Sequence, residues 1–277
     1  FDPDVHNAIN RQQPVEMVEV LVEKIRKRGF SSINFDLIYG LPRQSIKTVS
    51  DTIEIVSRMR PDLIAFYGYA HLPGRIKNQR LIKDNELPSP VLRRELYETG
   101  KKILRGHGYF DIGLDHFALP ESFLYKATSE GKLHRNFMGY VDKKSRILIG
   151  LGPTSISDSS VSFVQNAKEI DDYRAILKQD KLPIEKGHIH TAEDLNAQEM
   201  IMGIMCNGSI KLDKGKIPQW EEVKNELLEF EKDGLLNVKD EILTLTPEGK
   251  GFMRNVAMTF DHRLRNQESA VKFSQTI

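Results

Sequence analysis

The sequence is short of cysteine, of long apolar runs and of any excess of one charge. Its single cysteine, Cys206, excludes an intrachain disulfide and any metal site built from several cysteines of this chain. No apolar run approaches the roughly 20 residues that a membrane-spanning helix needs, and no signal peptide is apparent. A formal net charge of +1 gives no electrostatic reason to expect nucleic acid or membrane as a partner. A soluble, globular, cytoplasmic protein is therefore expected.

Helix-like and strand-like segments alternate in the first half of the chain. Apolar residues recur at helical spacing or form short continuous runs, and Pro14, Gly29 and Ser45 stand where helices begin or end. The expected elements are helix 14–28, strand 33–39, helix 46–59, strand 62–73, helix 89–106 and strands within 108–120 and 145–152. This order predicts an α/β fold with βαβ crossovers and a parallel sheet, with strand 33–39 buried on both faces.

The second half has a different pattern. Residues 192–206 and 218–233 are predicted helices, a hairpin follows around Lys239, and a helix is expected at about 247–260. This is the outline of a winged helix, so the chain is expected to divide into residues 1–185 and 186–277. Residues 191–262 hold 14 Asp and Glu against 8 Lys and Arg, which opposes DNA binding.

Polar residues follow the two early strands, in "INFDLIYGLP" and "YAHLP". Ligands of parallel α/β sheets bind at the carboxyl ends of strands, so Asp36, Ala70 and His71 are expected near a binding rim. A buried carboxylate is costly unless it is paired. Asp36 therefore serves a ligand, pairs with an arginine or caps a loop, and the spacing leaves these alternatives open.

Other candidate residues are less specific. Asp115 and His116 suit acid–base or metal chemistry, but neighbouring strand residues point to opposite faces and a structural role is as plausible. The segment "HRNFMGY", residues 134–140, suits either a stacking surface or a tight turn. The glycines in "LIGLGPTSIS" match neither a dinucleotide fingerprint nor a Walker loop.

Two further groups are expected to carry no chemistry. His188 and His190 could be a metal pair, but no third ligand is evident from the sequence, so no metal site is expected. Cys206 lies in an apolar helical segment and is expected in the core.

Seven segments taken together resemble one family. They are "FDPDVHNAINRQQP", "INFDLIYGLPRQ", "YAHLP", "GLDHFALP", "GKLHRNFMGY", "GLGPTSIS" and "FSQTI". In this order they resemble the oxygen-independent coproporphyrinogen III oxidases (dehydrogenases) of the radical S-adenosylmethionine family. The resemblance runs from residue 1 to residue 277.

The resemblance implies a fold and a reaction. The fold is an incomplete (β/α)6 radical-SAM barrel followed by a mostly helical C-terminal domain. A [4Fe–4S] cluster reductively cleaves S-adenosylmethionine, and the 5′-deoxyadenosyl radical starts the oxidative decarboxylation of two propionates of coproporphyrinogen III. The product is protoporphyrinogen IX of haem biosynthesis. Two S-adenosylmethionine molecules, an electron donor and a monomeric full-length enzyme are also implied, with no nucleic acid or membrane partner.

The matching segments do not include the part of the family's barrel that holds the cluster. Residues 33–39 would be the fifth barrel strand and 63–69 the sixth, so the chain is expected to be the C-terminal portion of a longer protein. Alone it is expected to be inactive, and its open strand edge is expected to cause self-association.

Carried over by motif, six residues are expected to contact S-adenosylmethionine. Arg11 would meet its carboxylate and Asp36 its ribose or amino group. Ile38 would be an apolar neighbour, and Ala70 would lie against the nucleoside through its backbone. Phe137 and Ile156 would flank the adenine. No catalytic acid, base or metal ligand is assigned by the resemblance.

Two alternatives remain. A haem-binding chaperone paralogue shares the superfamily but lacks the "HRNF-x-GY" pattern. A winged-helix DNA-binding regulator fits the outline of the second half but not its charge.

Overall fold

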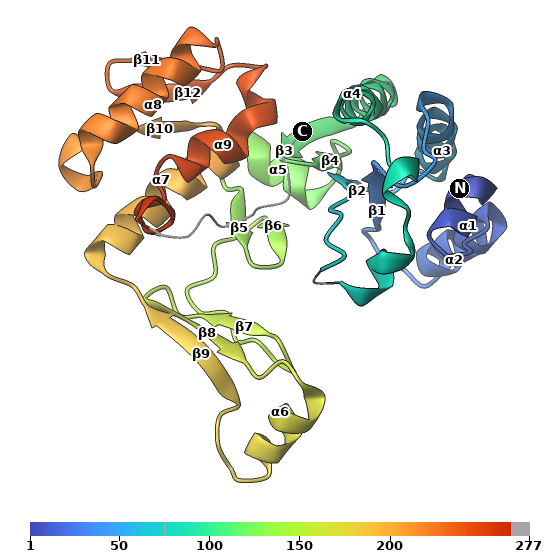
Figure 1. The fold of residues 1–277 in the computed structure, drawn as a ribbon, viewed down its shortest axis with the longest axis horizontal. Helices are drawn as coiled ribbons and strands as arrows, with labels where there is room; N and C mark the ends of the chain where they lie inside the picture. Colours follow the sequence, from blue (N-terminus) through green and yellow to red (C-terminus); the bar gives the residue numbers. More distant parts are fainter. Residues whose placement is uncertain (75, 267–277) are drawn as a thin grey trace. The chain divides into compact units, whose positions relative to one another are not determined.

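A computed structural model describes residues 1–74 and 76–266 (Figure 1). The described residues form two compact units, Phe1–Lys126 and residues 127–266, and the boundary falls within helix α5 (Phe123–Ser129). None of the helices in these two stretches is long and apolar enough to cross a lipid bilayer.

The first unit alternates helices with strands, as the sequence predicts. Its elements are α1 (Pro3–Ala8), α2 (Val15–Lys27), β1 (Asn34–Tyr39), α3 (Ile46–Met59), β2 (Leu63–Gly68), η1 (Lys77–Leu81), η2 (Asp84–Glu86), α4 (Pro90–Gly106), β3 (Phe110–Gly113) and β4 (His116–Ala118). The start of α3 is fixed locally, because the Ser45 side chain accepts from the Thr48 amide and the Thr48 side chain accepts from the Ser45 amide. Such local signals explain why the predicted helix bounds agree with the structure.

The sheet of this unit is mixed, with strand order β1-β2-β4-β3. Strands β1 and β2 are parallel and are joined through α3, as predicted. The expectation of a parallel sheet is wrong for residues 108–120, which form the antiparallel hairpin β3–β4 with β4 also antiparallel to β2. Only Leu114 and Asp115 join these two strands, too short a link for a parallel crossover. The α/β class is confirmed, and the description as part of a (β/α)6 barrel stays a prediction.

The two faces of β1 differ. Phe35, Leu37 and Tyr39 pack against the core formed with α3 and α4, whereas Asn34 and Asp36 on the other face are exposed. The prediction that this strand is buried on both faces is therefore wrong for the described residues, because α3 and α4 contact the core face alone. Asp36 bears no large desolvation cost here.

Close packing of α4 depends on Gly100. A Cβ atom at this position would lie 2.5 Å from a ring carbon of Phe66 and 2.7 Å from the Cδ1 atom of Ile53. Phe66, Ile53 and the nearby Leu96 are almost fully buried. Glycine in a helix interior costs about 1 kcal/mol relative to alanine, so its presence reflects the tight contact.

The second unit contains three small sheets and several helices. Its elements are the end of α5, β5 (His134–Asn136), β6 (Gly139–Val141), β7 (Ile156–Asp158), β8 (Ser162–Asn166), α6 (Ile170–Leu177), β9 (Ile184–Ile189), α7 (Ala192–Asn207), β10 (Ser209–Lys211), η3 (Lys214–Lys216), α8 (Trp220–Lys232), β11 (Leu236–Lys239), β12 (Ile242–Leu245), η4 (Gly249–Phe252), α9 (Met253–Met258) and α10 (His262–Arg265). The sheets are β5-β6, β7-β8-β9 and β10-β12-β11.

The predicted helix, helix and hairpin outline is confirmed by α7, α8 and the β11–β12 hairpin. The structure adds β10, which pairs with β12 and completes a three-stranded sheet. This strand is only three residues long, so it leaves no readable alternation in the sequence.

Residues 145–152 do not form the predicted strand. They contribute one isolated bridge, between Leu148 and Asp158. The Asn166 side chain donates hydrogen bonds to the carbonyls of Gly150 and Gly152, at 3.2 and 3.0 Å. Gly152 has a φ of 95°, a conformation that ends an extended run. Leu151 is 85% exposed, so the apolar run is not a buried strand.

The two compact units meet near residue 126, and the domain boundary predicted at 185/186 stays a prediction. The polar stretch 179–192 contains β9, which pairs with β8. The Tyr140 hydroxyl also donates to the Met205 carbonyl at 2.7 Å, linking β6 to α7. These non-local pairings group residues 127–185 with the C-terminal part.

Replacing Gly100 by alanine is expected to destabilise the first unit by about 1–3 kcal/mol, because the new methyl group overlaps Phe66 and Ile53. Urea unfolding followed by circular dichroism measures the change. Gly106→Ala in the last turn of the same helix is the matched control, since a Cβ there meets nothing within 4 Å. Equal stability of the two variants would show that α4 does not depend on this contact.

Candidate functional site

A cavity of about 550 Å³ lies in the first unit beside the edge of β1. Helices α1, α2 and α3 and strands β1 and β2 all contribute to its walls. Among the predicted site residues, Arg11, Asp36 and Ile38 all line it. The structure therefore brings three of the six together in one cavity.

Arg11 stands in the loop after α1 and is exposed. Its Nε and Nη2 atoms donate to the Gln13 side-chain oxygen at 3.4 and 3.3 Å, which are long bonds to a neutral group. Charge-assisted bonds from a guanidinium to a carboxylate are shorter and stronger. Arg11 can therefore exchange Gln13 for an anionic ligand at little cost.

Asp36 is supported by two neighbours on the exposed face of the strand pair. The Asn34 side-chain amide donates to its Oδ1 atom at 2.8 Å. Burial, and then the charge and hydrogen bond of Asp36, raise the pKa of Tyr67 above its ordinary value. Tyr67 thus remains a donor at neutral pH. An ionised Asp36 can only accept, so it suits a ligand that presents hydroxyl or ammonium donors.

Ala70 follows β2 and does not line this cavity. Its carbonyl accepts from the Gln79 side chain at 2.9 Å. The neighbouring His71 bonds to the Tyr69 hydroxyl at 3.1 Å and to Asp84 at 2.9 Å. The loop after β2 is therefore internally tied, and the contact expected of the Ala70 backbone stays a prediction.

Phe137 and Ile156 belong to the second unit. Phe137 lies between β5 and β6, is 49% exposed, and meets the Phe163 ring edge-on with centroids 4.8 Å apart. Ile156 begins β7 and pairs with Gln165. The segment 134–140 thus forms a tight hairpin, and its use as a stacking surface stays a prediction.

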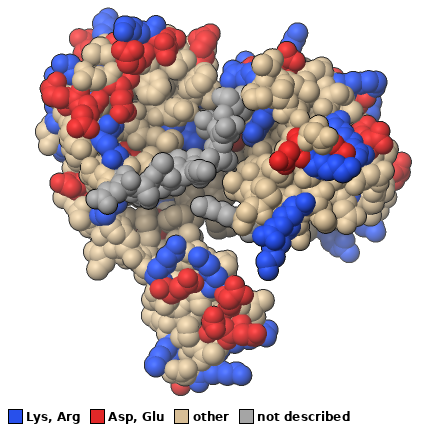
Figure 2. Space-filling model, viewed as in Figure 1, with Lys and Arg blue, Asp and Glu red and all other residues tan. Residues whose placement is uncertain are grey.

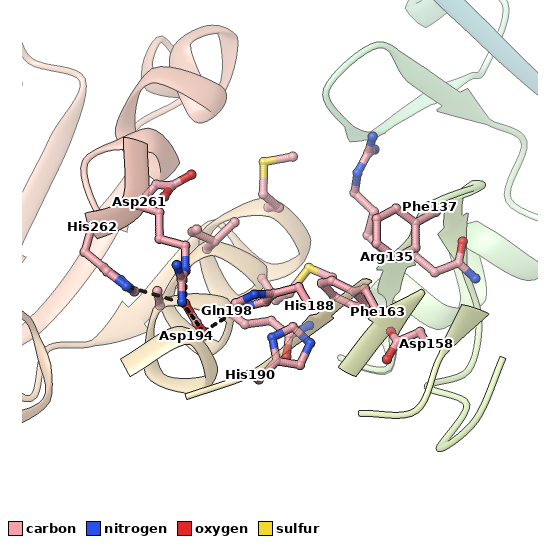
Figure 3. A pocket seen from close by; sticks show the side chains of 16 residues that line it. Arg135, Phe137, Asp158, Phe163, His188, His190, Asp194, Gln198, Asp261 and His262 are labelled. Carbon is pink, nitrogen blue, oxygen red and sulfur yellow. Dashed lines mark hydrogen bonds and ion pairs between the residues drawn. The ribbon is translucent and has the colours of Figure 1, made fainter. Parts of the chain in front are cut away.

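A second cavity, of about 500 Å³, lies within the second unit, with Asp194 in its wall (Figure 3). The Asp194 side chain is only 8% exposed. It accepts from Arg263 Nη2 at 2.9 Å, from His188 Nε2 at 2.8 Å and from the Thr191 amide at 2.9 Å. His262 Nε2 lies 3.4 Å away. The Arg263 hydrogen bond, chiefly, holds the pKa of Asp194 far below its usual range, so the carboxylate is ionised.

Asp194 was missed by the sequence reasoning, which found no third group beside His188 and His190. The signal was present, since Thr191 and Asp194 have the spacing of a capping box at the start of α7. That spacing places the Asp194 carboxylate in the first turn of α7, beside the end of β9.

The other candidates have clear structural positions. His116 begins β4 opposite Ala65, and the Asp115 carbonyl accepts from the Phe66 amide at 2.7 Å. An acid–base role for this pair stays a prediction. Cys206 is buried, and burial raises its pKa to about 11, so its thiol is protonated at neutral pH. The expectation that it is a core residue is confirmed.

The surface of the second unit carries acidic side chains where a DNA-binding module would be basic. Figure 2 shows Asp and Glu gathered over the region of α8 and the β11–β12 hairpin. Helix α8 alone contains Glu221, Glu222, Glu226, Glu229 and Glu231. Phosphate groups would be repelled by this surface.

Comparison with known proteins identifies relatives. Residues 191–252 match the model of the HemN C-terminal domain. Along its whole length the chain is 39% identical to the oxygen-independent coproporphyrinogen III oxidase of Helicobacter pylori (strain J99), and 35% identical to that of Escherichia coli (strain K12). The chain is thus related to these oxidases over its whole length. It spans 62% of the length of each of the two relatives.

A solved structure agrees with the sequence relatives. The chain matches coproporphyrinogen III oxidase (HemN) from Escherichia coli, described as a radical SAM enzyme, with a TM-score of 0.89 and 34% identity. The match covers 95% of this chain and 62% of that one. The family resemblance read from the seven sequence motifs is confirmed.

Asp194→Asn is expected to destabilise the second unit by about 1–3 kcal/mol at pH 7, because the charge of the group bonded to Arg263 is lost. The folded pKa of Asp194 is depressed, so its contribution is fully present above the unfolded pKa, about 3.9, and is lost as pH falls through the folded value. The stability difference from the parent should therefore shrink below about pH 4.

Urea unfolding between about pH 7 and pH 3.5 measures this difference. Asp180→Asn, in the exposed turn after α6, is the control and should change little. A difference that is the same at both ends of the pH range would show that the Asp194 charge does not stabilise this unit.

Proposed function

We propose that the protein containing this chain oxidatively decarboxylates two propionate side chains of coproporphyrinogen III, giving protoporphyrinogen IX in haem biosynthesis. The proposal is carried by the similarity of the whole chain to oxygen-independent coproporphyrinogen III oxidases. The meeting of Arg11, Asp36 and Ile38 in one cavity supports it.

Each of the two propionates undergoes the same overall change. The side chain loses one hydrogen atom from the carbon adjacent to the ring, its terminal carboxylate as CO2, and one electron to an acceptor. A carbon–carbon double bond remains, which is the vinyl group. The protein therefore needs a hydrogen-atom acceptor, an electron acceptor and a separate electron donor for its cluster.

The residues lining the first cavity fit S-adenosylmethionine. Arg11 offers a cation for the ligand's carboxylate, and Asp36 offers an acceptor for ribose hydroxyls or the α-ammonium group. Ile38, 37% exposed, offers apolar surface. When bound, S-adenosylmethionine and a [4Fe–4S] cluster supply the radical chemistry that removes the hydrogen atom. Cys206 is the single cysteine and is buried, so the cluster ligands must come from outside these 277 residues.

In the proposed reaction, residues of this chain bind and orient S-adenosylmethionine. Arg11 and Asp36 hold the polar ends of the ligand, which fixes its position by two opposite charges. Ala70, Phe137 and Ile156 would complete the nucleoside contacts, including those of a second S-adenosylmethionine molecule. The acidic surface over α8 fits a protein that acts on a small molecule in the cytoplasm and not on DNA.

The haem-binding chaperone is the competing hypothesis, and a titration separates the two. The full-length protein is expected to convert coproporphyrinogen III and to show no stoichiometric haem binding. Tight, equimolar haem binding together with an absence of conversion would favour the chaperone instead.

Arg11→Ala in the full-length protein is expected to weaken S-adenosylmethionine binding by about 10- to 100-fold, the usual range for a lost charge-assisted hydrogen bond. Asp36→Ala should act in the same direction. Isothermal titration with S-adenosylmethionine and measurement of coproporphyrinogen conversion test both. If two S-adenosylmethionine molecules bind, the affinity of one site should fall and the affinity of the other should stay unchanged.

The matched control is Arg28→Ala, an exposed arginine that follows α2 and does not line the cavity. It removes the same charge and should leave binding and conversion unchanged. Unchanged binding and conversion in Arg11→Ala and Asp36→Ala would contradict the assignment of the cavity.

A further inference from the structure

Two imidazoles and a carboxylate converge at the second cavity. His188 lies in β9, His190 stands one residue beyond its end, and Asp194 lies in the first turn of α7. One potential ligand atom from each residue lies within 4.8 Å of the others. Figure 3 shows the three side chains grouped beside one another. None of them has a role in the proposed decarboxylation.

The His190 ring is held in place but is not satisfied. Its Nε2 atom is buried and has no hydrogen-bond partner among the described residues. The ring contacts Phe163 edge-on, with centroids 4.3 Å apart, and His188 edge-on at 5.4 Å. Buried polar atoms are nearly always paired, so an unpartnered ring nitrogen beside a cavity indicates a missing ligand.

We propose that His188, His190 and Asp194 form a binding site for a divalent first-row transition metal of the zinc type. Imidazole nitrogen suits zinc, nickel, copper and iron, whereas calcium and magnesium prefer sites made of oxygen alone. Three protein ligands leave room for water as a further ligand, and the adjoining cavity of about 500 Å³ gives access. Binding requires small movements that bring the three atoms to metal–ligand distances.

The carboxylate of this site is already occupied by an internal cation. Arg263 forms two hydrogen bonds to Asp194, at 2.5 and 2.9 Å. A metal ion and a guanidinium compete for the same oxygens. The Arg263 side chain is 51% exposed, so it can release Asp194 and extend into water. Arg263 therefore lowers the metal affinity of the site.

Removing a ligand must weaken metal binding, while removing Arg263 must strengthen it. Because an unfolded chain can also bind metal through its histidines, the gain of affinity counts only in a variant that is folded. In folded variants these opposite effects separate a true site from loss of structure. The proposal does not depend on the oxidase activity.

The experiment titrates the 277-residue chain with Zn²⁺ alone, and with Co²⁺ alone to record its visible absorption bands. The parent chain should bind one equivalent at this site. His190→Gln should bind at least about 10-fold more weakly, and Arg263→Gln about 10-fold more tightly. Circular dichroism checks that each variant is folded.

His107→Gln is the matched control. His107 pairs with Glu54 at 2.9 Å in the first unit, so it is also a histidine beside a carboxylate. Among the described residues it belongs to no group of three potential metal ligands. Its removal should leave binding unchanged. Absence of binding in both the parent and Arg263→Gln, or equal affinity of the parent and His190→Gln, would overturn the proposal.

Discussion

The packing of α3 and α4 against one face of the β1–β2 pair is the constraint on which the first unit depends. Phe35, Leu37 and Tyr39 of β1 join that core, and the alternation of a strand then turns Asp36 to the opposite face. The close approach of α4 at Gly100 keeps this arrangement tight. Because of this packing, the polar residues Asn34 and Asp36 face the cavity beside β1. The hydrophobic core thus decides where the charged residues of the candidate site can stand.

In the second unit one charged group, Asp194, contacts several elements. Asp194 begins α7 as part of a capping box, and the same carboxylate contacts Arg263 of α10 and His188 of β9. Two consecutive elements, β9 and α7, are therefore connected to the distant α10 at one ionised group. A carboxylate that organises the structure in this way is also available to a metal, provided that its arginine can leave. Structural and ligand-binding roles need not be alternatives at this residue.

The first cavity is characterised by the charges of its lining residues. The chain spans 62% of the length of the oxidases it resembles. Arg11 and Asp36 offer opposite charges across a single space, which suits a zwitterionic ligand with hydroxyl groups. The acidic α8 surface disfavours contact with nucleic-acid phosphates, and the raised pKa of Cys206 disfavours thiolate chemistry at that residue.

The sequence alone determined the helices of the first unit, the βαβ crossover, the winged-helix outline and the resemblance to the oxidase family. These depend on local signals, such as the Ser45 cap and apolar periodicity, or on motifs long enough to be specific. Only the tertiary structure decided which face of β1 is open, that residues 108–120 form an antiparallel hairpin, and that residues 127–185 group with the C-terminal part. It also brought Arg263 to Asp194 and joined β9 to β8. The physical reason is that strand pairing and charge clusters bring together residues distant in the chain, and no local pattern encodes which distant partner will be met.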